Sequence, residues 1–145
     1  MEPSQIALTG VILAGGAGRR MGGIDKGLAP FAGRPLVEWA IDALAPQVAT
    51  LVLSANRNID AYATYGHPVV QDAISGFQGP LAGLLSAMRI APTGWILTLP
   101  CDTPRPPSDL GARLVCALRD QGADLAVATD GTRSHSLHAL LPVSQ

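Results

Sequence analysis

The most informative part of this sequence runs from Leu13 to Gly27 and reads LAGGAGRRMGGIDKG. It contains six glycines, two arginines and Lys26, the only lysine of the chain. Glycines allow backbone N–H groups to approach an anion without obstruction by a Cβ atom. Arginine matches phosphate oxygens with its planar fork and lysine supplies a compact charge, so the stretch predicts a phosphate-binding loop. A surface loop with solvated arginines is the alternative interpretation.

Short apolar runs on either side of this loop predict buried strands. Four of them span Ile6 to Ala14, Thr50 to Ala55, His67 to Asp72 and Gly94 to Asp102. A further stretch, from Asp124 to Val143, predicts two strands that meet at the turn Asp130-Gly131.

Apolar residues at helical spacing lie between these strands. The predicted helices are Pro35 to Gln47, a short stretch from Asn58 to Tyr65, one that begins at Pro80, and one that Ser108 caps and Gly122 ends. The alternation predicts an α/β fold, a Rossmann-like three-layer sandwich with a mostly parallel sheet and helices on both faces. A chain of 145 residues is expected to form a single domain, 1–145.

The overall composition excludes several classes of partner. Hydrophobic residues make up 48% of the chain and charged residues 14%, which is typical of a compact globular protein. A net charge of −1 gives no reason to expect nucleic acid or a membrane surface as a partner. Cys101 and Cys116 lack the spacing of a metal site, and the first ten residues, MEPSQIALTG, lack the features of a signal peptide. A cytoplasmic protein is therefore expected.

Polar residues follow the carboxyl end of each predicted parallel strand, where open α/β sheets bind their ligands. The phosphate-binding loop follows the first strand, Ser54 and Asn56 close the second, and Asp72 and Asp102 close the third and fourth. The place of Asp102 at the mouth of an apolar strand favours metal binding. Both aspartates also fit a purely structural role in a turn. Gly79 stands at a predicted helix start, which suits an anion or a plain turn.

The loop resembles the signature L-A-G-G-x-x-x-R-M-G-x-x-K of nucleotidyltransferases, and most closely the form G-R-R-M-G-G-x-D-K-G of molybdenum cofactor guanylyltransferases. Other segments match that family in order and spacing: GRPLVEWAIDAL, LSANRN, VVQD, GPLAGLLSAM and PCDTPRPPSDLGARL. The resemblance covers about residues 8 to 120. It implies transfer of GMP from GTP to the phosphate of Mo-molybdopterin, with Mg²⁺ as cofactor and pyrophosphate as the second product.

The resemblance also implies roles for individual residues. The backbone of Leu13, Ala14 and Gly15 is expected to hold guanine and ribose, while Arg20 and Lys26 contact the triphosphate. Gly16 and Gly23 match loop positions at which a side chain would obstruct the substrate. Ser54, Asn56 and Asp72 match positions that contact the nucleotide. Asp102 matches the aspartate that binds Mg²⁺ and phosphate.

The resemblance is incomplete towards the carboxyl end. Members of the family continue for several strands and helices after ALL, so the chain is expected to lack the family's C-terminal part and a share of its acceptor site. The alternatives are a molybdopterin cytidylyltransferase or other NTP transferase, and a catalytically impaired protein that binds GTP or a pterin. Molybdoenzyme-specific chaperones and other cofactor-synthesis proteins are the partners that the resemblance implies.

Overall fold

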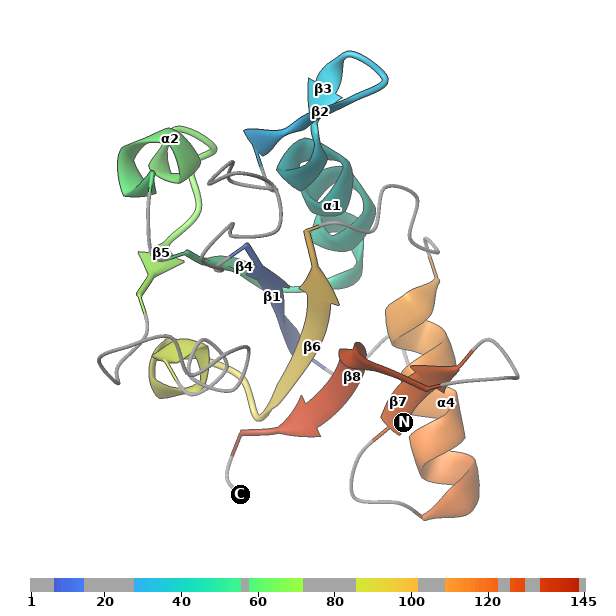
Figure 1. Cartoon of the computed structure of the whole chain (residues 1–145). Coiled ribbons are helices and arrows are strands. Elements are labelled where there is room, and N and C mark those ends of the chain that lie inside the picture. Colours follow the sequence, from blue (N-terminus) through green and yellow to red (C-terminus); the bar gives the residue numbers. More distant parts are fainter. Residues whose placement is uncertain are drawn as a thin grey trace.

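The computed structural model describes residues 7–14, 28–55, 58–71, 86–101, 109–122, 126–129 and 134–143. A six-stranded sheet of order β5-β4-β1-β6-β8-β7 runs through its centre (Figure 1). Its strands are β1 (Leu8–Leu13), β4 (Thr50–Ser54), β5 (Val69–Val70), β6 (Trp95–Pro100), β7 (Ala126–Thr129) and β8 (Ser134–Pro142). The first four strands in the spatial order are parallel, and β8 is antiparallel to both of its neighbours.

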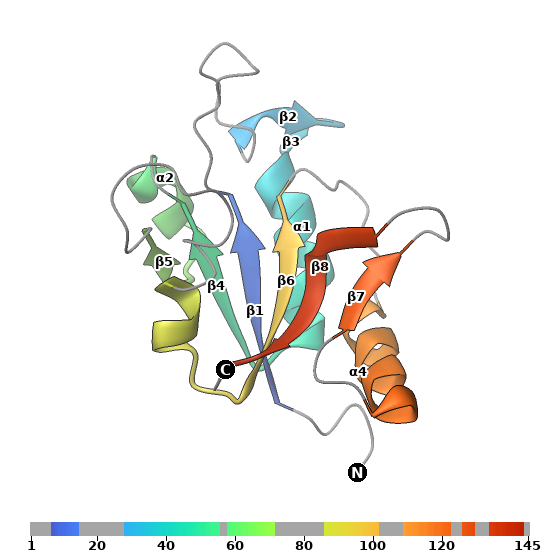
Figure 2. The same cartoon turned by 60° about the horizontal axis from the view of Figure 1, so that its bottom comes forward.

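Helices cover both faces of this sheet (Figure 2). The helical elements are α1 (Leu36–Leu44), the 3₁₀ turn η4 (Ala45–Gln47), α2 (Ile59–Ala63), residues 86–90 and α4 (Leu110–Gln121). Leu44 of α1 and Leu114 of α4 share one core cluster with Ile12, whereas Ala87 packs with Val11 in a second cluster. Adjacent strand residues point to opposite faces, so these clusters fill the two sides of the sheet. The predicted three-layer α/β sandwich is confirmed.

A close approach of α1 to the sheet explains one glycine of β1. A Cβ atom at Gly10 would lie 2.9 Å from the side chains of both Leu44 and Leu51. The helix and the neighbouring strand therefore occupy the volume that a side chain at this position would need. Gly10 lets two large residues close the core over the middle of β1.

The structure corrects the predicted start of the last long helix. Asp109 occupies the N-cap position of α4 and forms no side-chain cap hydrogen bond, and the predicted cap, Ser108, lies outside the described residues. The Oε1 atom of Gln47 instead accepts a hydrogen bond of 2.7 Å from the backbone N–H of Gly111. The end of α4 is as predicted, because Gly122 adopts the left-handed conformation with φ of 58°.

A small hairpin that the sequence analysis did not predict precedes α1. Its strands are β2 (Pro30–Phe31) and β3 (Arg34–Pro35), which pair in antiparallel register. Ala32 and Gly33 form the turn with φ values of 52° and 84°. Both turn residues have positive φ, as the two-residue loops of twisted hairpins often require. The chain thus enters α1 directly from the hairpin.

The two strands at the carboxyl end are present as predicted, and their turn at Asp130-Gly131 lies outside the described residues. The buried Thr98 of β6 ties β8 to the sheet through its hydroxyl. Its Oγ1 atom accepts a hydrogen bond of 3.0 Å from Ala139 N and donates one of 3.3 Å to Ala139 O. The predicted third strand is shorter than expected, since β5 contains only Val69 and Val70.

Candidate functional site

The carboxyl ends of the parallel strands lie side by side at one edge of the sheet (Figure 2). Leu13, the last residue of β1, is opposite Ser54 of β4 on one side and Pro100 of β6 on the other. Hydrogen bonds continue beyond the strands: Ala14 N donates to Ser54 O at 2.8 Å and Cys101 N donates to Leu13 O at 3.1 Å. The segments that follow β1, β4 and β6 therefore begin next to one another, at positions that these hydrogen bonds fix.

Most of the predicted site residues follow the ends of β1, β4 and β6 in the sequence. Three of them, Leu13, Ala14 and Ser54, belong to the described part of the chain. The others lie outside the described residues: Gly15, Gly16, Arg20, Gly23, Lys26, Asn56, Asp72, Gly79 and Asp102. In the sequence, four of these come directly after the described ends of segments, at positions 15, 56, 72 and 102. Their assignment to a site stays a prediction.

The three described site residues present almost no side-chain surface. Leu13 and Ala14 are each 8% exposed and Ser54 is 2% exposed. The side chain of Leu13 packs with Val11 and Val52, while that of Ala14 belongs to the core cluster on the other face. A ligand at this edge would therefore meet mainly backbone at the ends of β1 and β4. The backbone contacts expected from Leu13 and Ala14, and the contact expected from Ser54, stay predictions.

No described group of three or more His, Cys, Asp or Glu residues is arranged to hold a metal ion. The predicted metal ligand, Asp102, lies just beyond the described residue Cys101, which is 5% exposed and lies in the core. Cys101 therefore packs as a small apolar residue of the core.

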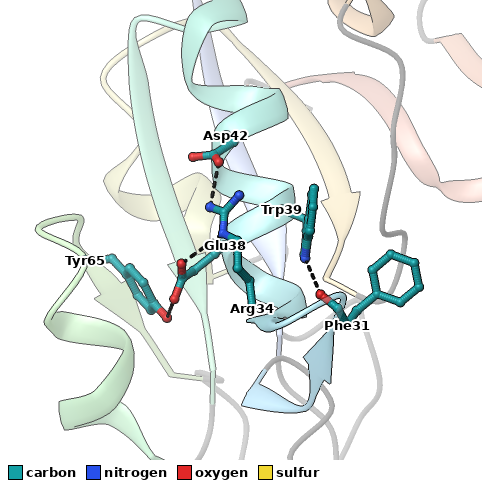
Figure 3. Close-up of polar contacts among 6 residues, drawn as sticks. All are labelled: Phe31, Arg34, Glu38, Trp39, Asp42 and Tyr65. Carbon is teal, nitrogen blue, oxygen red and sulfur yellow. Dashed lines mark hydrogen bonds and ion pairs between the residues drawn. The ribbon is translucent and has the colours of Figure 1, made fainter.

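A network of polar side chains lies beside this edge, and the sequence analysis did not identify it (Figure 3). Arg34 of β3 donates from Nη2 to Asp42 Oδ2 at 2.6 Å and from Nε to Glu38 Oε1 at 3.3 Å. The other oxygen of Glu38 accepts a hydrogen bond of 2.9 Å from the hydroxyl of Tyr65. The local signal is the spacing of Glu38 and Asp42, which places both side chains on one side of α1, next to Arg34 of the preceding strand.

Two pKa values change because of this network. The hydrogen bond to Asp42 raises the pKa of Arg34, which keeps the guanidinium charged. Burial, and then the hydrogen bond to Glu38, raises the pKa of the Tyr65 hydroxyl to about 12. Tyr65 is therefore a neutral hydrogen-bond donor at physiological pH, and Glu38 is its acceptor.

An apolar hollow lies at the opposite edge of the sheet. Its lining comes from η4, from the amino end of β4 and from the segment before β5, including Val48, Leu51 and Pro68. Ligands of parallel sheets bind at the carboxyl edge, so this hollow does not coincide with the candidate site. Among the described helices, none has the length and apolar character that a bilayer crossing requires.

Known proteins share the sequence and the fold of this chain. Residues 10–144 match the MobA-like NTP transferase domain. The chain belongs to this family. A molybdenum cofactor guanylyltransferase of Cupriavidus pinatubonensis is 47% identical over 142 residues, which cover 94% of this chain and 71% of that protein. One of Pasteurella multocida is 48% identical over 139 residues, covering 96% of this chain and 74% of that protein.

A solved structure gives the same fold. The molybdopterin-guanine dinucleotide biosynthesis protein A of Archaeoglobus fulgidus superposes with a TM-score of 0.74. The match covers 94% of this chain and 68% of that one, at 23% sequence identity. The family membership makes the chain a nucleotidyltransferase domain and supports the resemblance that the loop motif carries.

Proposed function

We propose that this protein transfers GMP from GTP to the phosphate of Mo-molybdopterin and releases pyrophosphate. The observation that carries the proposal is the common edge at which β1, β4 and β6 end, because the glycine-rich loop, Asn56 and Asp102 all follow it in the sequence. Relatives at 47% identity over most of the chain are molybdenum cofactor guanylyltransferases, which favours GTP over CTP.

The proposed chemistry is a displacement at phosphorus. A phosphate oxygen of the acceptor forms a bond to the α-phosphorus of GTP, and the bond from that phosphorus to the bridging oxygen of the β-phosphate breaks. The electron pair leaves with pyrophosphate. The acceptor phosphate is already anionic, so the step needs no general base among the side chains. Negative charge grows on the phosphoryl oxygens, and cationic groups lower the barrier by stabilising it.

The residues that we assign to this step are few. Backbone at Leu13 and Ala14 binds guanine and ribose, while Arg20 and Lys26 neutralise the triphosphate. Asp102 would hold a divalent cation, which we propose to be Mg²⁺. When bound, such an ion polarises phosphoryl oxygens and neutralises the leaving pyrophosphate.

Release of pyrophosphate with each nucleotide tests the proposal. Purified protein is incubated with Mo-molybdopterin, Mg²⁺ and either GTP or CTP, and pyrophosphate is measured together with the dinucleotide product. We expect turnover with GTP and at least tenfold less with CTP. Preference for CTP would identify a cytidylyltransferase instead, and tight GTP binding without pyrophosphate would identify a catalytically inactive binding protein.

Variants at the assigned residues test the site separately from the substrate. We expect Lys26→Ala and Asp102→Ala to weaken binding of GTP in the presence of Mg²⁺, measured by calorimetry. Arg119→Ala, at the exposed carboxyl end of α4, is the matched control for the loss of one charge. Unchanged GTP affinity in both site variants would show that the assignment is wrong, whichever nucleotide is the substrate.

A further inference from the structure

The β2–β3 hairpin cannot be stable through its own contacts. It has two residues in each strand, Pro30 and Phe31 of β2 are exposed, and isolated two-stranded hairpins are at best marginally stable in water. Its attachment to the rest of the fold must therefore come from outside the hairpin. The attachment matters because the hairpin begins three residues after Gly27, the end of the glycine-rich stretch.

Helix α1 supplies that attachment. Trp39 donates from Nε1 to the Phe31 carbonyl at 2.8 Å and meets the Phe31 ring edge-on, with the ring centres 6.0 Å apart. The guanidinium of Arg34 lies over the Trp39 ring at 4.8 Å from its centre. Arg34 is also paired with Glu38 and Asp42 of the same helix. Each of the two hairpin strands is thus joined to α1 (Figure 3).

Glu38 has a second function that Asp42 lacks. Its Oε2 atom accepts the hydrogen bond from Tyr65, a residue 27 positions away that follows α2. The α2 helix begins at Ile59, shortly after β4 ends at the candidate edge. The Glu38 carboxylate therefore joins the hairpin, which follows β1 in the sequence, to the segment that follows β4. Leu36 N also donates to Ala29 O at 2.9 Å, which fixes the hairpin base against α1.

We propose that Glu38 is a positioning residue for the nucleotide site. This inference rests on the proposed function, because it assumes that Arg20 and Lys26 bind the triphosphate. Glu38 contacts no substrate in this proposal. It holds Arg34 and Tyr65 in place. Through them it supports the β2–β3 hairpin, which follows the glycine-rich stretch, and the segment that follows β4.

The expected effect follows from preorganisation. Groups that are held in place before a ligand binds lose less conformational entropy when it binds, so loosening their support weakens binding. Removal of Glu38 leaves Arg34 with Asp42 but leaves the Tyr65 hydroxyl without this acceptor. The change should therefore appear in the affinity for nucleotide more than in the chemical step.

Kinetics of three variants test the proposal. We expect Glu38→Ala to raise the KM for GTP about three- to tenfold with kcat within about twofold of wild type, as typical coupling energies allow. Glu38→Gln retains one carbonyl acceptor and should lie between Glu38→Ala and wild type. The control is Arg113→Ala, which breaks a surface ion pair of the same i, i+4 type with Asp109 at 2.8 Å. We expect it to leave the KM unchanged.

A double-mutant cycle separates a shared support from a general loss of stability. Arg34→Gln and Tyr65→Phe remove the two partners of Glu38 singly and together. If both act through Glu38, their effects on the KM for GTP will be less than additive. Strict additivity, or a fall in melting temperature with an unchanged KM in Glu38→Ala, would overturn the proposal.

Direct binding distinguishes failure of this inference from failure of the proposed function. GTP and Mg²⁺ are titrated into wild type and Glu38→Ala in a calorimeter. Wild-type binding that is three- to tenfold tighter supports the inference. Equal affinities in the two proteins overturn the inference alone. If the wild type binds none of the four common nucleoside triphosphates, the proposed function fails, and the positioning role fails with it.

Discussion

The Gln47 side chain accepts a hydrogen bond from Gly111 N at 2.7 Å, although the two residues are 64 positions apart in the sequence. The first N–H groups of a helix have no partner within the helix, and a side chain just before it normally supplies one. In α4 that function comes instead from η4. The same side chain donates from Nε2 to Ala43 O at 2.8 Å, so Gln47 joins the ends of α1 and α4.

We expect Gln47→Met to lower the free energy of unfolding by about 1–2 kcal/mol, the usual cost of losing a helix cap. Methionine keeps the length and apolar part of the side chain but removes both hydrogen bonds. Urea denaturation measures the change, and Gln121→Met, at an exposed position of α4, is the control. Equal losses in the two variants would mean that the bond to Gly111 contributes nothing.

Two buried hydroxyl groups should respond in opposite ways to removal. Ser86 is 7% exposed, and its Oγ atom has no hydrogen-bond partner among the residues that the structure describes. Ser86→Ala removes an unsatisfied polar atom, so we expect stability to stay equal or to rise by up to about 1 kcal/mol. Thr98→Val removes a hydroxyl that bonds Ala139 twice and should cost about 1–2 kcal/mol. A larger loss in Ser86→Ala than in Thr98→Val would contradict this prediction.

Titration of Tyr65 should lower the free energy of unfolding in alkaline solution. Its pKa rises from 10.0 in the unfolded chain to about 12 in the folded protein. Between these values the folded state retains a proton that the unfolded state has lost, so the free energy of unfolding decreases as pH rises through this range. The contribution is complete below pH 10.

The difference in unfolding free energy between wild type and Tyr65→Phe should therefore be larger at about pH 9 than at about pH 11.5. Denaturation in urea at both pH values measures it, and absorbance of the tyrosinate ion follows the titration directly. A difference that does not change with pH would show that Tyr65 titrates alike in the folded and unfolded states.

Removal of the divalent cation should abolish turnover. We expect EDTA to stop pyrophosphate release and added Mg²⁺ to restore it. Asp102→Asn should lower kcat about 100-fold or more, as the loss of an electrostatic group at the reacting phosphate typically does. Asp109→Asn changes another aspartate, which pairs only with Arg113 in the described structure, and serves as the control. Full activity of Asp102→Asn in excess Mg²⁺ would exclude Asp102 as the metal ligand.

The parts of the fold that the sequence predicts are those with local causes. The apolar runs of β1, β4 and β6 and the left-handed Gly122 depend on neighbouring residues and were predicted correctly. The β2–β3 hairpin was not, because it contains two prolines and places Ala32 in a conformation that alanine disfavours. Contacts to α1 stabilise that hairpin, and such contacts leave no local pattern.

In the candidate site, too, features with local causes were predicted and features that depend on distant contacts were not. The rule that parallel strands end at one edge predicted that Ser54 would lie at the same edge as the start of the glycine-rich stretch, and Ser54 is paired with Leu13 in the sheet. The contact of Glu38 with Tyr65 spans 27 positions and depends on the relative placement of α1 and α2. Sequence spacing alone relates Glu38 to Arg34 and Asp42, so only the structure reveals this link between two segments of the edge.

The position of β8 has a consequence for protein synthesis. The ribosome makes β7 before β8, yet β8 lies between β7 and β6 in the finished sheet, and among the described strands β7 pairs only with β8. Until residues 134–142 have emerged, β6 lacks its partner on that side and β7 has none at all. Unpaired strand edges promote association between nascent chains. The interval between translation of β6 and of β8 is therefore a period in which the unpaired edges of β6 and β7 can associate with other chains.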